Sequence, residues 1–271
     1  MKPDLHKYIK SGRNRVKGWF SRCDAEIFGA ILDTQMTNGI EGSVVEIGTH
    51  HGKSFIPLAL SNNSKNSYVI DIFEDQHYNI DSSGTGNKER FLKNIEEAGI
   101  DTSSITIDQR PSTDVLPADI VSKVGKSRFF HVDGGHNFET VSHDINLALA
   151  VQSDPGVICV DDAFRPEWPD VAAAIFRTDS FIKGDSVMFA IGFNKAYFCH
   201  KEQVSFYQDA LLESRILKLF MTGSYKHGKT NVDIYQQLPL PEWKLKYRFW
   251  WYLKQYHPDV ALALRDLLLR Q

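Results

Sequence analysis

The sequence predicts an α/β domain with a doubly wound, mainly parallel sheet and helices on both of its faces. Two observations lead to this fold class. Short β-branched runs alternate with segments of helical periodicity between residues 24 and 191, and the first of these runs ends in a glycine turn. Regular alternation of strand and helix builds parallel sheets covered on both sides. Ligands of such sheets sit at the carboxyl ends of the strands.

The elements follow in order along the chain. Apolar residues at helical spacing predict a helix over 24–35, and the run Val44–Gly48 predicts the first strand and its turn. Later strands are expected at 67–72, 104–107, 128–132, 157–160 and 186–191, and later helices at 54–60, 88–98, 114–124 and 139–151.

This pattern divides the chain into three parts. The main domain is expected at 41–200, after a helical extension at 1–40 and before a helical, aromatic-rich extension at 201–271. We expect residues 201–271 to act as a lid, as additional packing or as an oligomerisation segment. The third role would make the protein a homo-oligomer. Buried packing is the ordinary explanation for such aromatic residues.

Composition narrows the class of partner. The net charge is -3 and the sequence pI about 6.4, whereas nucleic-acid binding needs a concentrated excess of Lys and Arg. No run is long and uncharged enough to cross a membrane. The three cysteines are widely spaced, which predicts reduced, structural thiols. We therefore expect a cytoplasmic protein with a small-molecule partner and no nucleic-acid or membrane partner.

The segment VVEIGTHHGKS contains the first candidate binding site. Gly48 and Gly52 lie in the turn between strand and helix, where glycine lets the backbone approach a ligand and the helix offers free N–H groups. The spacing is neither the GxGxxG dinucleotide pattern nor a P-loop. Asp71 ends the next strand, roughly 20 residues after the turn, which is the register of a ribose-binding acid. A solvated strand-end acid is the alternative.

Acidic residues also end two later strands. Asp133 follows one strand and Asp161-Asp162 follow the next, so in a parallel sheet their carboxylates are expected to converge at one edge. Three oxygen ligands at one edge suit Mg²⁺. His136 lies three residues after Asp133, over the same cleft. His131 lies inside a strand and is expected to pack.

Taken together, these residues resemble a known family. The pattern E-x-G-x-x-x-G-x-S from Glu46 to Ser54, the acid Asp71 and the later aspartates are similar to class I S-adenosylmethionine-dependent methyltransferases, which have a Rossmann-like fold. Within them, the similarity is to the metal-dependent branch with catechol O-methyltransferase and the macrolide-sugar O-methyltransferases. It covers about residues 40–195. The cofactor-binding residues that it implies are Glu46, Gly48, Thr49, Gly52, Ser54, Asp71, Ile72, Ser112 and Asp133.

The resemblance also implies a mechanism. Asp133, Asp161 and Asp162 would bind the metal, and His136 would be the general base that removes a proton from a metal-bound hydroxyl. An aspartate at 162 and a histidine at 136 match the sugar-modifying members rather than the catechol type. The expected reaction is methyl transfer from S-adenosylmethionine to a hydroxyl of a sugar or glycosylated natural product.

Two alternatives stay open at this point. One keeps the cofactor but has no metal, so that the strand-end acids only form hydrogen bonds. The other is a non-catalytic cofactor-binding or assembly protein that acts through its C-terminal part. In either case the long polar loop 73–91 is a lid or a solvated insertion.

Overall fold

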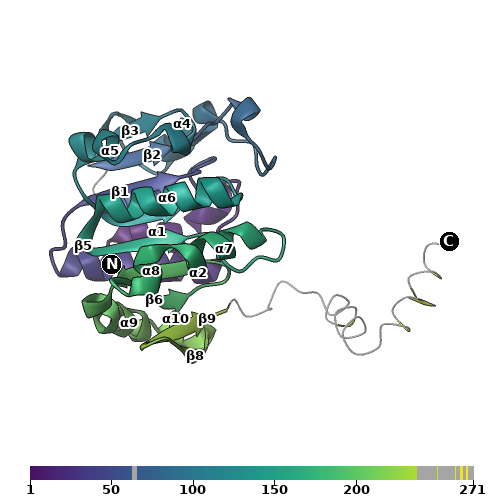
Figure 1. Cartoon of the computed structure of the whole chain (residues 1–271). Coiled ribbons are helices and arrows are strands. Elements are labelled where there is room, and N and C mark those ends of the chain that lie inside the picture. Colours follow the sequence, from purple (N-terminus) through teal and green to yellow (C-terminus); the bar gives the residue numbers. More distant parts are fainter. Residues whose placement is uncertain (63–65, 237–248, 250–259, 261–262, 265–266, 268–271) are drawn as a thin grey trace. The chain divides into compact units, whose positions relative to one another are not determined.

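The computed structural model describes residues 1–62, 66–236, 249, 260, 263–264 and 267 (Figure 1). The chain divides into two compact units, Met1–Gln236 and Gln237–Gln271, and every element named below lies in the first. Among the described residues no helix has the length and apolar character needed to span a membrane.

Nine strands of the described chain form one sheet, in the order β3-β2-β1-β4-β5-β7-β6-β9-β8. β1 to β5 pair in parallel, whereas β7 runs antiparallel to both of its neighbours, β5 and β6. This arrangement confirms the predicted fold class. The strands are β1 Ser43–Ile47, β2 Ser67–Ile70, β3 Ile105–Asp108, β4 Ser127–Val132, β5 Gln152–Val160, β6 Ser186–Ile191, β7 Ala196–His200, β8 Met221–His227 and β9 Thr230–Tyr235.

Helices cover both faces of the sheet because alternate strand residues point to opposite sides. Val44 and Phe129 pack with α1, α2, α3, α4, α9 and α10 on one face, and Val45 and Phe130 pack with α5, α6 and α7 on the other. The helices are α1 Pro3–Lys10, α2 Arg22–Thr37, α3 Phe55–Ser61, α4 Lys88–Glu97, α5 Pro117–Val124, α6 Phe138–Val151, α7 Pro169–Arg177, α8 Asp179–Lys183, α9 Val204–Glu213 and α10 Arg215–Phe220.

The segment after residue 200 differs from the expected helical extension. Residues 201–236 contain α9, α10 and the β8–β9 hairpin, and β9 extends the sheet by pairing with β6. Val232 and Tyr235 of β9 are fully buried, so the hairpin contributes to the core. The remainder of the expected extension, including most of its aromatic cluster, lies outside the described residues.

A buried polar network joins these outer elements to the sheet. Gln35 of α2 donates hydrogen bonds to the Arg128 carbonyl (2.7 Å) and the Tyr207 hydroxyl (3.0 Å). The Arg128 guanidinium donates to the Gln35 side-chain oxygen (2.5 Å) and to Ser61 Oγ (2.8 Å). Tyr207 of α9 donates to the carbonyl of Pro155. Because these groups are buried, each unmade bond is costly, and the network fixes how α2 and α9 pack on β4 and β5.

The variant Tyr207→Phe tests this network. Loss of the hydroxyl leaves the Pro155 carbonyl without this donor, so we expect the free energy of unfolding to fall by about 1–3 kcal/mol in urea denaturation. Tyr225→Phe is the matched control, because Tyr225 is 43% exposed. That control should stay within about 0.5 kcal/mol of the original protein. Equal losses in the two variants would contradict the structural importance of the network.

Candidate functional site

The turn after β1 is in direct contact with the end of β4. Gly48 has a φ of +80°, and a Cβ placed on it would lie 1.7 Å from the backbone oxygen of Asp133. Its N–H donates to the Ile70 carbonyl (2.9 Å), while the Asp133 N–H donates to the Ile47 carbonyl (3.0 Å). Only glycine fits this position, so the turn brings the ends of β1, β2 and β4 together.

Buried polar side chains at the end of β1 stabilise the turn that follows it. Glu46 is fully buried, and its carboxylate accepts a hydrogen bond from Thr49 Oγ1 (2.7 Å) and lies 2.6 Å from His131 Nδ1. Burial raises the pKa of Glu46 to about 7, although the bonds from Thr49 and Ser54 oppose the rise. The Gly52 N–H donates to the Thr49 carbonyl (2.7 Å). Glu46 and Thr49 therefore hold the shape of the turn, and direct contact with a cofactor remains a prediction for them.

Asp71 lies beside the glycine turn, directly after β2. One carboxylate oxygen accepts the His50 N–H (2.6 Å) and the other accepts the Phe73 N–H (2.6 Å). Burial raises the pKa of Asp71 to about 6, and backbone hydrogen bonds from Phe73, His50 and Thr49 counteract this. A carboxylate offers about four lone-pair sites, so it can accept a further bond from a ligand. The expected juxtaposition of acid and turn is thus present.

The other two predicted cofactor residues lie at the same edge of the sheet. The Ile72 carbonyl accepts the Asp75 N–H (2.8 Å) at the start of the long loop. Ser112 opens a short turn after β3, and its side chain hydrogen-bonds to the buried Asp144. Their contact with a cofactor also remains a prediction.

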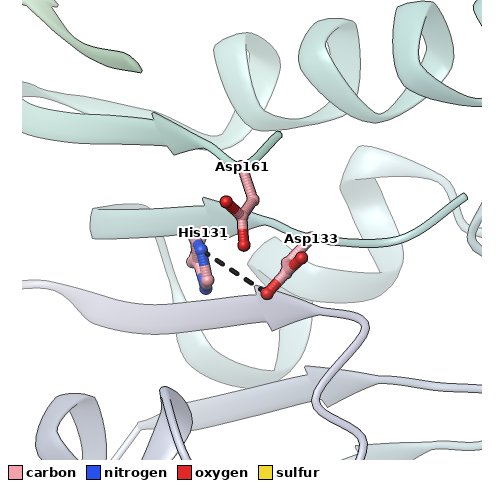
Figure 2. A group of neighbouring side chains, drawn as sticks. All are labelled: His131, Asp133 and Asp161. Carbon is pink, nitrogen blue, oxygen red and sulfur yellow. Dashed lines mark ion pairs between the residues drawn. The ribbon is translucent and has the colours of Figure 1, made fainter. Parts of the chain in front are cut away.

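Asp133, Asp161 and His131 converge at the ends of β4 and β5 (Figure 2), with ligand atoms within 4.8 Å of one another. The side chain of Lys195 lies among them. Its Nζ forms an ion pair with Asp161, is 3.1 Å from His131 Nε2 and 3.9 Å from Asp133 Oδ2. Burial raises the pKa of Asp133 well above its usual value, and the neighbouring charge of Asp161 adds to this. Lys195, absent from the sequence-based site, is therefore central to it.

Asp162 does not join this group. Its backbone is left-handed, with a φ of +53°, and its carboxylate lies 3.0 Å from His136 Nε2 and accepts the Asn194 side-chain N–H at 2.6 Å. The structure therefore brings two of the three predicted metal ligands together and directs the third elsewhere. The reason is local: consecutive residues at a strand end point in different directions, and the turn at Asp162 increases the difference.

The residues at this position do not fit Mg²⁺ as they are arranged. Mg²⁺ requires near-octahedral oxygen ligands. Here Asp161 is paired with an ammonium group, and the third neighbour is the ring nitrogen of His131, which faces the same ammonium. A second, divalent cation in this buried space would be repelled by Lys195.

His136 lies between two carboxylates. Its Nδ1 is 2.8 Å from Asp81 and its Nε2 3.0 Å from Asp162, and the ring stacks on Trp168 with centroids 4.3 Å apart. Burial alone would lower the pKa of His136, but the hydrogen bonds to Asp162 and Asp81 outweigh it and raise that pKa above 6.5. The arrangement favours the imidazolium form, so His136 must lose one carboxylate partner and its proton before it can act as a base.

Asp81 also defines the position of the long loop. It accepts hydrogen bonds from both the backbone and the ring of His136, which ties the loop 73–91 to the strand ends. Neither Asp81 nor Lys195 was identified from the sequence. A lysine next to the apolar run AYFC was the available signal for Lys195, whereas Asp81 is one of several polar residues in its loop.

Gly48→Ala tests the contact between the turn and β4. Left-handed strain and overlap with a backbone atom together should lower the free energy of unfolding by about 3–5 kcal/mol in urea denaturation. Gly99→Ala is the matched control, because Gly99 has a φ of +76° and free space around its Cα. Strain alone should cost about 1–2 kcal/mol there. Similar losses of unfolding free energy at both positions would contradict the close contact between Gly48 and the Asp133 backbone.

A second prediction concerns pH. Because the folded state raises the pKa of His136, its stabilising effect is complete below the unfolded pKa and is lost as pH rises through the folded pKa. The difference in unfolding free energy between the original protein and His136→Gln should therefore shrink as pH increases from about 6 to 9. Exposed His6, changed to Gln, is the control. A difference that grows with pH would contradict the imidazolium assignment.

Comparisons with known proteins agree with this geometry. Residues 45–163, from β1 to just beyond β5, match a family model described as a methyltransferase domain. No curated protein matches the chain.

Solved structures share the fold. The O-methyltransferase NovP has a TM-score of 0.54 at 14% identity, over 68% of this chain and 83% of its own. CalS11, a TDP-rhamnose 3'-O-methyltransferase in calicheamicin biosynthesis, has 0.50 at 10% identity, over 73% and 95%. MycE, from the mycinamycin biosynthetic pathway and in complex with Mg and SAH, has 0.50 at 15% identity, over 74% and 55%. Residues 45–163 of this chain thus match a methyltransferase domain, and the chain shares its fold with these O-methyltransferases.

Proposed function

We propose that the chain transfers the methyl group of S-adenosylmethionine to a hydroxyl oxygen of a small molecule. The observation that carries the proposal is the position of Asp71 beside the glycine turn, within the region that matches the methyltransferase model. A carboxylate there accepts hydrogen bonds from ribose hydroxyls, and the glycine turn before α3 lets the backbone approach the methionine part closely. Ser54 and Ser112 are the further polar contacts in this proposal.

The transfer itself is a displacement at the sulfonium methyl. The acceptor oxygen forms the new bond to carbon, the bond from carbon to sulfur breaks, and S-adenosylhomocysteine leaves as a neutral thioether. The chain has to orient the acceptor and take up its proton, and orientation supplies much of the rate enhancement in such reactions.

His136 is the proposed proton acceptor. When an acceptor hydroxyl replaces Asp162 at Nε2 and the ring is neutral, the bond from Nδ1 to Asp81 keeps the imidazole oriented. A histidine oriented by one carboxylate while its other nitrogen faces the substrate is a common base arrangement. In addition, the indole of Trp168 stacks on the His136 ring and keeps its plane in place.

A sugar hydroxyl, free or on a glycosylated natural product, is the proposed acceptor. CalS11 is a TDP-rhamnose 3'-O-methyltransferase by its description, and MycE belongs to a mycinamycin pathway. The strand-end acids and the polar loop 73–91 around His136 suit a hydroxyl-rich ligand. The Mg²⁺ that the sequence predicted is not included, because of the position of Lys195; the metal-independent alternative is favoured by that observation.

The first experiment is calorimetric titration with S-adenosylmethionine and S-adenosylhomocysteine. We expect dissociation constants in about the micromolar range. Asp71→Asn should weaken binding about tenfold or more, because one of its oxygens no longer accepts hydrogen bonds. Asp101→Asn is the control, since Asp101 is exposed and far along the chain from the turn. Thermal melts of both variants establish that they are folded.

Methyl transfer is then measured with labelled cofactor and a panel of free, nucleotide-linked and glycosidic sugars. Transfer to a hydroxyl supports the proposal. Failure to bind S-adenosylmethionine and S-adenosylhomocysteine would refute the proposed function. Cofactor binding without transfer to any acceptor would favour a non-catalytic binding protein.

A further inference from the structure

We infer that the ammonium group of Lys195 occupies the place, among Asp133, Asp161 and His131, for which the sequence predicted a divalent metal. Its positive charge compensates these carboxylates in place of a metal ion. The site would then bind no divalent cation. Its meaning for catalysis rests on the proposed methyl transfer, but the inference about the cation does not.

The first support is the burial and coordination of Lys195. Its side chain is 1% exposed. The ammonium group is paired with Asp161 and hydrogen-bonds to His131 Nε2 at 3.1 Å, while Asp133 Oδ2, at 3.9 Å, adds electrostatic attraction without a hydrogen bond. A buried charge is retained only where it is paired and hydrogen-bonded, and Asp161 and His131 satisfy that condition.

The second support is the state of His131. Lys195 donates to Nε2, so the ring proton is on Nδ1, where it is donated to Glu46 at 2.6 Å. Both ring nitrogens are therefore occupied, and His131 has no lone pair left for a metal.

The third support is the turn between β6 and β7. Its consecutive residues Asn194 and Lys195 bind the consecutive acids Asp162 and Asp161. Backbone bonds hold the turn in place: the Gly192 N–H donates to the Lys195 carbonyl (2.8 Å), and the Ala163 N–H donates to the Asn194 carbonyl (2.9 Å). Lys195 therefore lies on a turn that backbone hydrogen bonds hold in place, and its position is part of the fold.

Lys195 is a positioning residue in this inference. It compensates the charge of Asp161 and lies near Asp133, and it holds these carboxylates in place at the strand ends. Removal of the ammonium would leave two neighbouring carboxylates and a free imidazole nitrogen, which is a set of ligands that a divalent metal does bind.

The test is titration of the full chain with Mn²⁺, followed by electron paramagnetic resonance of the free ion. We expect no specific site in the original protein and one site in Lys195→Ala, with apparent affinity at least about tenfold higher. Mn²⁺ should also raise the melting temperature of Lys195→Ala and not that of the original protein. Lys195→Arg keeps the charge and should remain without a site, and Lys195→Ala/Asp161→Ala should lose the gained site.

A stoichiometric Mn²⁺ site in the original protein that disappears in Asp161→Ala would overturn the inference. Equal, weak Mn²⁺ binding by the folded original and Lys195→Ala proteins would overturn it as well. If Lys195→Ala does not fold, the titrations of the original protein and of Lys195→Arg decide the question. Binding of S-adenosylhomocysteine, measured on the same samples, separates the two proposals, because its absence would refute the methyltransferase function without affecting the Mn²⁺ result.

Discussion

Acidic side chains enter the interior from the carboxyl edge of the sheet, and their charge is compensated there by a lysine from a neighbouring turn. Asp133, Asp161 and, from α2, Asp24 all act on the buried ammonium of Lys195. Burial disfavours every one of these charges separately, so they are stable in the core only as a balanced group. The ends of β4 and β5, the start of α2 and the β6–β7 turn therefore depend on one another.

Two charge networks meet at the adjacent acids Asp161 and Asp162. The first runs from Glu46 through His131 and Lys195 to Asp161, whose side chain is 10% exposed. The second joins Asp162 to His136 and to Asp81 of the long loop, and each of these side chains is 11% exposed. Glu46, His131 and Lys195 are at most 1% exposed, so the inner part of the first network fixes the geometry, and both networks reach the surface at the two adjacent acids.

The match to the methyltransferase family model ends before the residues that determine the cation. The matched region stops at residue 163, just after the two adjacent acids, whereas Asn194 and Lys195 lie beyond it on the antiparallel side of the sheet. Parallel strands place acids at a common edge for any such fold. The turn that leads into the antiparallel strand β7 adds Lys195, whose ammonium group pairs with these acids. With this pairing the negative charge of the acids is compensated by the chain itself and needs no metal ion.

Features with local causes could be predicted from the sequence: the alternation of strands and helices, the glycine required at position 48, and the strand-end acids Asp71, Asp133 and Asp161. Which side chains meet depends on the folded sheet. Lys195 contacts a histidine 64 residues away, and Asp81 contacts one 55 residues away. Such partners follow from strand order and from the balance of buried charge, which are properties of the assembled sheet. The pairing of β9 with β6 depends on the same non-local contacts.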